Sequence, residues 1–213
     1  MTTMTEDEAA DYWRARHERV GTWSSGNIAL SDEENLVRYQ MILSAVLSSM
    51  GLDRITPPPR TRLLDAGAGK GWFTDRFQEL GFDVTAAEKS PSAIASLRAS
   101  LPRGVIISQV DIARHLVGQW FEVVLCLDVA FHITQDDRWE SAITNLGNSV
   151  APGGMLLLSD NEDDSDKSPA GYIVYRGPKR YRSLLGPLGF EQVSASPYPG
   201  EPGLALFRYD RSH

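Results

Sequence analysis

Between residues 62 and 159, short apolar runs alternate regularly with amphipathic stretches. Strand-like runs are expected at 62–65, 82–88, 105–107, 121–127 and 155–158. They are apolar enough to be covered on both faces, which is typical of strands that lie between two layers of helices. The alternation therefore predicts an α/β fold built on a doubly wound, mostly parallel sheet.

The segments between these runs carry helix signals. Ser90 is a cap residue followed by a proline at the first helical position. Gly81 predicts the end of the helix that follows the first strand. Thr134 is expected to cap a helix whose buried face includes Trp139 and Ile143.

The C-terminal part continues the alternation of strand and helix and then ends in two antiparallel strands. We expect a strand over 172–175 and a helix over 181–188. The runs 190–195 and 204–209 are separated by prolines and a glycine, and they predict an antiparallel hairpin on the edge of the sheet.

Residues 1–56 are predicted to form an N-terminal helical extension, and residues 57–213 the core. Pro57-Pro58-Pro59 marks the boundary because this run prevents regular structure. Ser31 and Glu34 have the spacing of a capping box at the start of a helix. The expected buried face of that helix carries Leu36, Tyr39, Leu43, Val46 and Met50.

Composition excludes several classes. A chain of 213 residues is the size of one domain, and the single cysteine, Cys126, rules out an internal disulfide. A net charge of −7 argues against a general nucleic-acid binder. No apolar run reaches the roughly 18 residues of a membrane span, and the acidic N-terminus is unlike a signal peptide, so we expect a cytoplasmic protein.

A glycine-rich loop, Asp65-Ala-Gly67-Ala-Gly69-Lys70-Gly71, directly follows the first strand. Ligands of such sheets bind at the carboxyl ends of the strands, where the strand order reverses. A phosphate-binding nucleotide loop is excluded because Leu64 stands where its first glycine is needed and Gly71 replaces its hydroxyl residue. A dinucleotide fingerprint is weak because Trp72 replaces the third glycine.

With this loop, the chain resembles the class I S-adenosylmethionine-dependent methyltransferases of the small-molecule type, over residues 62–159 and more weakly through 209. The resemblance implies a Rossmann-like sheet and S-adenosyl-L-methionine as cofactor. Asp65 and the loop would hold the methionine part, Glu88 the ribose hydroxyls, and Asp111 the adenine amine with Ile112 beside the ring. The full expected cofactor set is Asp65, Gly67, Ala68, Gly69, Glu88, Lys89, Asp111, Ile112 and Leu127.

The chemistry of these acids is consistent with that cofactor. An ionised carboxylate accepts hydroxyl hydrogen bonds well, and a sulfonium cation is stabilised by nearby acids. Asp65 or Glu88 taken alone could be a capping carboxylate. Three acids at consecutive strand ends favour the cofactor site, whereas Lys70 either points to solvent or contacts a carboxylate of a ligand.

The segment after the fourth strand normally faces the transferred methyl group in this family. Val129-Ala130 breaks the motif of enzymes that methylate exocyclic amines of nucleic-acid bases. His132 is the candidate general base, because its pKa normally lies near neutral pH, or it packs near the cofactor without moving a proton. Asp128 would orient His132, bind substrate or cap the next helix, and Cys126 is expected in the core.

The remaining candidates lie at the two ends of the chain. Tyr12, Trp13, His17 and Trp23 would form a lid that binds substrate, or would pack against the sheet edge. Arg176 is the member of the basic cluster Arg176, Lys179, Arg180 and Arg182 that would face substrate. Of the acids at 160–166, Asp160 with Asp128 could ligate magnesium, but such runs are usually solvated and no metal is predicted.

The sequence thus predicts S-adenosylmethionine-dependent methyl transfer to a small molecule, with a hydroxyl oxygen of a sugar or natural product favoured because of His132. No nucleic-acid or membrane partner is expected, and the oligomeric state is left open. The alternatives are a methyltransferase acting on a protein or RNA docked at the basic cluster, and a cofactor-binding protein that transfers no methyl group.

Overall fold

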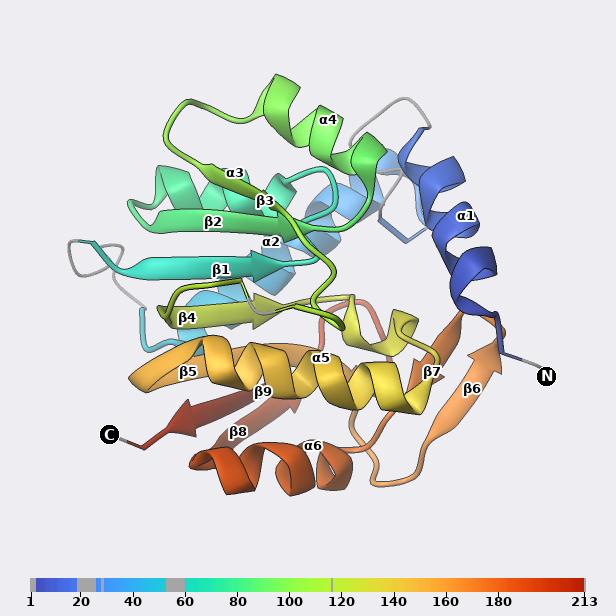
Figure 1. Cartoon of the computed structure of the whole chain (residues 1–213), viewed down its shortest axis with the longest axis vertical. Coiled ribbons are helices and arrows are strands. Elements are labelled where there is room, and N and C mark those ends of the chain that lie inside the picture. Colours follow the sequence, from blue (N-terminus) through green and yellow to red (C-terminus); the bar gives the residue numbers. More distant parts are fainter. Residues whose placement is uncertain (1–2, 19–25, 28, 53–59, 116, 213) are drawn as a thin grey trace.

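The computed structural model describes residues 3–18, 26–27, 29–52, 60–115 and 117–212 (Figure 1). The strands are β1 (Arg62–Ala66), β2 (Asp83–Glu88), β3 (Ile106–Gln109), β4 (Phe121–Cys126), β5 (Val150–Asn161), β6 (Lys167–Ala170), β7 (Ile173–Tyr175), β8 (Phe190–Pro197) and β9 (Leu204–Arg211). The α-helices are α1 (Glu6–His17), α2 (Asp32–Ser49), α3 (Trp72–Glu79), α4 (Pro91–Ser100), α5 (Asp136–Ser149) and α6 (Pro178–Leu185). Two short 3₁₀ turns, η2 (Ala130–His132) and η3 (Gly186–Leu188), complete the described elements.

The main sheet has seven strands in the order β3-β2-β1-β4-β5-β9-β8. β1 to β5 run parallel, whereas β9 pairs antiparallel with both β5 and β8. The doubly wound, mostly parallel sheet with an antiparallel C-terminal hairpin is therefore confirmed. The strand order reverses between β1 and β4, and this is the place where such a sheet opens a crevice at its carboxyl edge.

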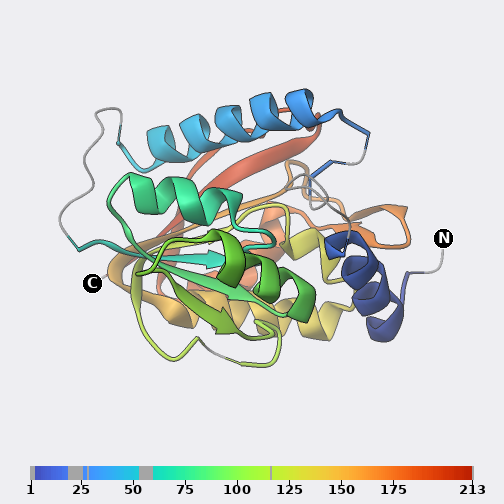
Figure 2. The ribbon, with the colours of Figure 1, turned by 90° about the horizontal axis from the view of Figure 1, so that it is seen from above.

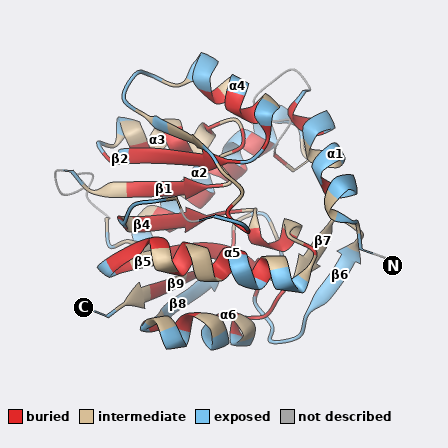
Figure 3. Ribbon diagram, viewed as in Figure 1, coloured by how far each residue is buried: buried red, intermediate tan, exposed pale blue. Residues whose placement is uncertain are grey.

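The buried strands alternate their side chains between two apolar layers. Leu63 packs with α2 and α3 on one face, whereas the next residue, Leu64, packs with α5 and α6 on the other. Figure 2 shows α2 and α3 above the sheet and α5 below it. The central strands are buried along most of their length and the outer helix faces are exposed (Figure 3). The apolar runs are explained by burial on both faces.

The first two helices have different relations to the sheet. α2 begins at Ser31, which forms the predicted capping box with Glu34, and it packs Ile42 and Val46 into the core. Leu36 was expected on this face but is exposed. The buried face of α2 passes through Asn35, Arg38 and Ile42, and Leu36 lies outside it. α1 lies across the carboxyl ends of the strands instead (Figure 1). The predicted boundary at Pro57-Pro58-Pro59 lies outside the described residues, as does Trp23.

Two local predictions are corrected. The strand expected over 172–175 does not join the main sheet, because β7 pairs only with β6 in a separate antiparallel hairpin. Thr134 does not cap α5; its hydroxyl donates to the carbonyl of Met4, and Gln135 occupies the cap position without a side-chain bond. None of the helices described is both long and apolar enough to cross a membrane.

Candidate active site

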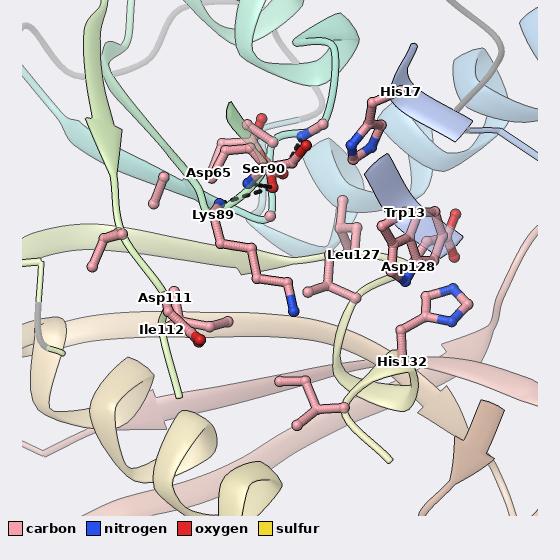
Figure 4. A pocket seen from close by; sticks show the side chains of 18 of the residues that line it. Trp13, His17, Asp65, Lys89, Ser90, Asp111, Ile112, Leu127, Asp128 and His132 are labelled. Carbon is pink, nitrogen blue, oxygen red and sulfur yellow. Dashed lines mark hydrogen bonds between the residues drawn. The ribbon is translucent and has the colours of Figure 1, made fainter. Parts of the chain in front are cut away.

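A pocket opens where the strand order reverses. Its floor comes from the segments that follow β1, β2, β3 and β4, and α1 forms one wall. Figure 4 shows Asp65, Lys89 and Ser90 at one end of the pocket and Trp13, Asp128 and His132 at the other. Strand ends that are far apart in the sequence therefore meet at one site.

The loop after β1 brings its backbone against the pocket. The N–H groups of Gly67 and Ala68 donate to the carbonyl of Ala87 in β2, at 2.8 and 3.1 Å. Gly67 has a φ of 80°, and a Cβ atom built there would lie 2.4 Å from the side chain of Val129. Glycine is therefore required at Gly67 by both conformation and space.

Gly71 starts α3 in the left-handed conformation, with a φ of 86°. A Cβ atom at this position would meet Leu97 of α4 at 2.6 Å. The helix N-terminus is therefore set against α4, and its first turn faces the pocket through Trp72 and Phe73. An N-terminal turn that is open to a pocket offers backbone donors to a ligand.

Glu88 ends β2 and is buried beside the glycine loop. One carboxylate oxygen accepts the N–H of Gly69 at 3.0 Å, and the other accepts the N–H groups of Lys89 and Ser90 at 2.8 Å each. These bonds fix the carboxylate at the floor of the pocket, which it lines. A carboxylate oxygen has further lone pairs, so Glu88 can still accept bonds from the hydroxyls of a ligand.

Asp65 ends β1 and is almost completely buried, yet it reaches the pocket. Burial raises its pKa to about 6, against the effect of the Thr74 hydroxyl, which donates to it at 2.6 Å. Thr74 was not singled out from the sequence. Its position one turn into the helix after the loop is the signal that would have indicated it.

Asp111, after β3, lines the pocket with Ile112. Its carboxylate accepts the N–H of Ala113 at 3.0 Å and a guanidinium N–H of Arg138 at 2.6 Å. Burial opposes the ionisation of Asp111, but the hydrogen bonds from Arg138 and Ala113 outweigh it and lower its pKa. Arg138 itself lines the pocket, and sequence reasoning missed it because its partner lies 27 residues away.

His132 lies at the other end of the pocket, in the 3₁₀ turn after β4. Its Nδ1 is 3.0 Å from the carbonyl oxygen of Tyr172. Because a carbonyl oxygen only accepts hydrogen bonds, Nδ1 carries the proton and Nε2 keeps a lone pair. Burial lowers the pKa of His132 to about 4, so the ring is neutral near neutral pH. His132 is therefore a weak base whose Nε2 can accept a hydrogen bond.

Asp128 does not orient His132. Its carboxylate forms two hydrogen bonds with Arg38 of α2, at 2.9 and 3.2 Å. Asp128 also has a φ of 57°, a left-handed conformation that a non-glycine residue adopts only where its surroundings enforce it. Here its own N–H donates to the hydroxyl of Ser159 at 2.8 Å. The expected carboxylate is present at the pocket, but an arginine that the sequence did not reveal neutralises it.

The N-terminal helix contributes two of its three predicted residues to the pocket. Trp13 lines it and lies edge-on to His132, with ring centroids 4.5 Å apart. His17 also lines it, is buried, and has an Nδ1 without a hydrogen-bond partner. Burial lowers the pKa of His17. Tyr12 is not among the lining residues, because its ring stacks on Tyr172 at 4.8 Å.

Arg176 is not placed in the pocket. Its side chain is completely buried, and its guanidinium donates to Asp136 and to the carbonyl of Thr134. It also stacks over Trp139, at 4.8 Å from the ring centroid. These interactions join the segment after β7 to α5, so the predicted substrate contact of Arg176 has no support from its position here.

Two other members of the basic cluster also pair with acids. Arg180 forms ion pairs with Asp136 and Asp166, and Arg182 lies 3.4 Å from Asp164. The acidic run and the basic cluster therefore lie against each other, although no local pattern in the sequence links them.

The two carboxylates considered as magnesium ligands have other partners. Asp160 accepts from the Tyr181 hydroxyl and from the N–H of Arg176, and burial raises its pKa to about 7. Asp128 is paired with Arg38. Within the described ranges, no group of three or more His, Cys, Asp or Glu side chains is placed to hold a metal ion. Cys126 is buried in the core, as predicted.

The pocket fits the cofactor that the sequence resemblance implies. Carboxylates from the ends of β1, β2 and β3 all reach it, together with the glycine loop. The unpartnered Nδ1 of His17 is a buried polar atom in its wall, and such an atom normally has a partner. Lys70 lines the pocket, and Lys89, which was predicted to bind the cofactor, extends across it in Figure 4. Leu127 and Ala68 line it as well.

Comparisons with known proteins agree with this geometry. A family model described as a methyltransferase domain matches residues 38–191. The chain is 28% identical over 163 residues to the glycine/sarcosine N-methyltransferase of Halorhodospira halochloris, covering 70% of this chain and 55% of that protein. It is 28% identical over 131 residues to the ubiquinone biosynthesis O-methyltransferase of Sinorhizobium fredii, covering 59% and 52%. The chain thus spans about half the length of these curated relatives.

The fold is shared with the N-methyltransferase NodS of Bradyrhizobium japonicum WM9, solved in complex with S-adenosyl-L-homocysteine. The TM-score is 0.72 at 16% identity, over 96% of this chain and 99% of that one. At this identity the likeness concerns the fold, whereas the family model covers most of the residues that build the pocket. The chain therefore belongs to the methyltransferase-domain family, the class I S-adenosylmethionine-dependent methyltransferases.

Proposed function

We propose that this protein transfers a methyl group from S-adenosylmethionine to a hydroxyl oxygen of a flat, largely apolar small molecule. The observation that carries the proposal is the meeting of three strand-end acids, Asp65, Glu88 and Asp111, with the glycine loop in one pocket that also contains a neutral histidine. When bound, S-adenosylmethionine supplies a methyl group on a positively charged sulfur, which leaves as a neutral thioether.

The cofactor would occupy the half of the pocket that is lined by the loop and the acids. Glu88, held by three backbone N–H groups, would accept the ribose hydroxyls. Asp111 and Ile112 would contact the adenine, and Asp65 with Gly67, Ala68 and Gly69 would contact the methionine part. Lys89 and Leu127 complete the lining of this half. Trp13 and His17 of α1 would close the site and exclude water.

His132 would act on the acceptor. Its Nε2 lone pair, fixed by the bond from Nδ1 to Tyr172, would accept the hydroxyl hydrogen and orient the oxygen for in-line attack. A pKa of about 4 makes full proton transfer unfavourable before the reaction begins. Transfer would therefore accompany bond formation, when the oxygen becomes strongly acidic.

Two groups of aromatic rings in the pocket walls support a flat acceptor. Trp13 lies on one side, and Tyr39, Trp72 and Phe73 form a second aromatic cluster, with ring centroids 5.0 to 5.3 Å apart. Asp128, the acid beside these rings, is neutralised by Arg38. With Asp128 neutralised, these rings offer an uncharged flat molecule apolar surface to pack against.

An amine acceptor is the second candidate, because the glycine/sarcosine N-methyltransferase is among the relatives. An amine needs only to be unprotonated, and it would then use His132 as a hydrogen-bond acceptor rather than as a base. The two candidates differ in the dependence of turnover on His132.

The test has a binding part and a turnover part. Isothermal titration of the purified protein with S-adenosylhomocysteine should give a saturable one-to-one isotherm, and no heat of binding would reject the proposal. Turnover of S-adenosylmethionine should then be screened with uncharged phenols against glycine and sarcosine, using mass spectrometry to detect the methylated product. Methylation of a phenol, reduced at least 100-fold in His132→Gln with S-adenosylhomocysteine affinity retained, is the expected result. Methylation of only the amino acids would favour the second candidate.

A further inference from the structure

Four charged side chains from three separate parts of the chain form a closed ring at the mouth of the pocket. Glu6 belongs to α1, Arg138 to α5, and Asp111 and Arg114 to the turn that follows β3. Arg138 pairs with Asp111 at 2.6 Å and also with Glu6. Arg114 pairs with Glu6 at 2.9 Å and lies 3.7 Å from Asp111. Each carboxylate therefore contacts both guanidinium groups.

Arg138 is the least exposed member of this ring. Its side chain is 15% exposed and that of Asp111 is 21% exposed, whereas Glu6 and Arg114 are 41% and 57% exposed. Isolated exposed pairs contribute little, but a partly buried guanidinium between two carboxylates forms a network with stronger hydrogen bonds. We therefore attribute most of the stabilisation by the ring to the two contacts of Arg138.

The helix that carries Glu6 buries few residues, and besides polar contacts it is held by two ring contacts, Tyr12 on Tyr172 and Trp13 against His132. Its only buried residues are Ala9, Arg16 and His17, and two of these carry polar side chains. Its N-terminal end is held by polar contacts, in which the N–H of Met4 donates to Gly171 at 2.8 Å and its carbonyl accepts from Gln135. An element that buries so few residues opens at a low free-energy cost, so the charged ring contributes to keeping α1 over the pocket.

We propose that Arg138 is a positioning residue that couples the α1 lid to the cofactor site through Asp111. The same carboxylate that is expected to contact the adenine also anchors, through Arg138, the helix that carries Trp13 and His17 over the pocket. Cofactor release therefore requires the Glu6 contacts to break, and the position of Asp111 depends on the lid. This inference rests on the proposed cofactor site and adds a determinant of its binding and release rates.

The test compares two charge-neutralising variants on the same helix. Glu6→Gln breaks the ring, whereas Asp11→Asn removes an ion pair with Arg14 that lies wholly within α1 and is well exposed. Both variants remove one acid from α1, and Asp7→Asn, which removes an acid from the same first turn as Glu6, measures how much of the effect comes from the helix dipole. The first measurement is amide hydrogen exchange of the 6–17 segment without ligand. Exchange should be at least fivefold faster in Glu6→Gln and near the wild-type rate in Asp11→Asn.

The second measurement is the dissociation rate of S-adenosylhomocysteine by stopped flow. The rate should rise at least fivefold in Glu6→Gln and in Arg138→Gln. In Arg138→Lys it should lie between the rates of Arg138→Gln and the wild type. Michaelis constants for S-adenosylmethionine should rise while kcat stays within twofold for Glu6→Gln. Unchanged exchange in Glu6→Gln would show that the ring does not hold α1 in place. Faster exchange with an unchanged dissociation rate would show that the position of α1 does not affect cofactor release. Failure of the wild type to bind S-adenosylhomocysteine would instead count against the proposed function, because the exchange measurement needs no ligand.

Discussion

Substitution of Glu88 by Gln separates the two roles that a carboxylate at this position can have. Glu88 accepts three backbone N–H groups, those of Gly69, Lys89 and Ser90. A glutamine in the same rotamer keeps its oxygen on Lys89 and Ser90 but turns an NH₂ group toward the N–H of Gly69. One buried donor then loses its acceptor, which costs about 1–3 kcal/mol of unfolding free energy. For a chain of this length, that lowers Tm by about 3–9 °C.

The effect on the cofactor is a separate quantity. If Glu88 binds the ribose hydroxyls, loss of its charge removes about 1.5–3 kcal/mol of binding free energy, so the Kd for S-adenosylhomocysteine rises about 10- to 150-fold. Calorimetry gives Tm, and isothermal titration gives Kd on the same samples. A lower Tm with a Kd within twofold of the wild type would refute the ribose assignment and leave Glu88 as a carboxylate that only holds the loop.

Glu122→Gln is the matched control. Glu122 also accepts a backbone N–H, from Arg62 at 2.8 Å, but it lies near the start of β4, at the opposite edge of the sheet from the pocket. Its substitution should lower Tm without changing Kd. A comparable rise of Kd in this variant would show that the affinity reports general destabilisation.

Three further outcomes are expected. Because the folded pKa of His132 is about 4, below the roughly 6.5 of an unfolded histidine, the unfolded state takes up a proton first as the pH falls. Urea unfolding should therefore show the wild type losing about 2 kcal/mol more than His132→Gln between pH 7 and pH 5, and equal losses would contradict the buried neutral ring. Gly67→Ala should lower Tm and abolish S-adenosylhomocysteine binding, because its Cβ would lie 2.4 Å from Val129; the double variant with Val129→Ala should recover part of the Tm. Arg176→Ala should lose about 2–3 kcal/mol of unfolding free energy in urea while the Kd stays within twofold, and a large rise of Kd would restore the predicted ligand contact.

The central fold could be predicted because its signals are local. An apolar strand that is buried on both faces needs an uninterrupted run, and each of the runs expected between residues 62 and 158 coincides with a strand of the parallel sheet. The C-terminal hairpin followed from two runs separated by turn residues. A strand is expected over 172–175, where β7 lies, but its pairing with β6 could not be predicted, because the short and mostly exposed β6 carries no apolar run.

The candidate site residues show the same difference between local signals and contacts made by folding. Asp65, Glu88 and Asp111 follow consecutive strands in the sequence, and parallel strands bring such residues to one edge of the sheet. The partners of the charged side chains come from folding alone: Arg38 neutralises Asp128, Arg138 joins Asp111 to Glu6 of α1, and Arg176 pairs with Asp136 inside the protein. The partners of these arginines lie 27 to 132 positions away, and no local pattern encodes a contact over that separation. Burial, which sets the pKa of His132 and Asp65, is likewise a property of the packed molecule, because it depends on how much of the chain excludes water from one group.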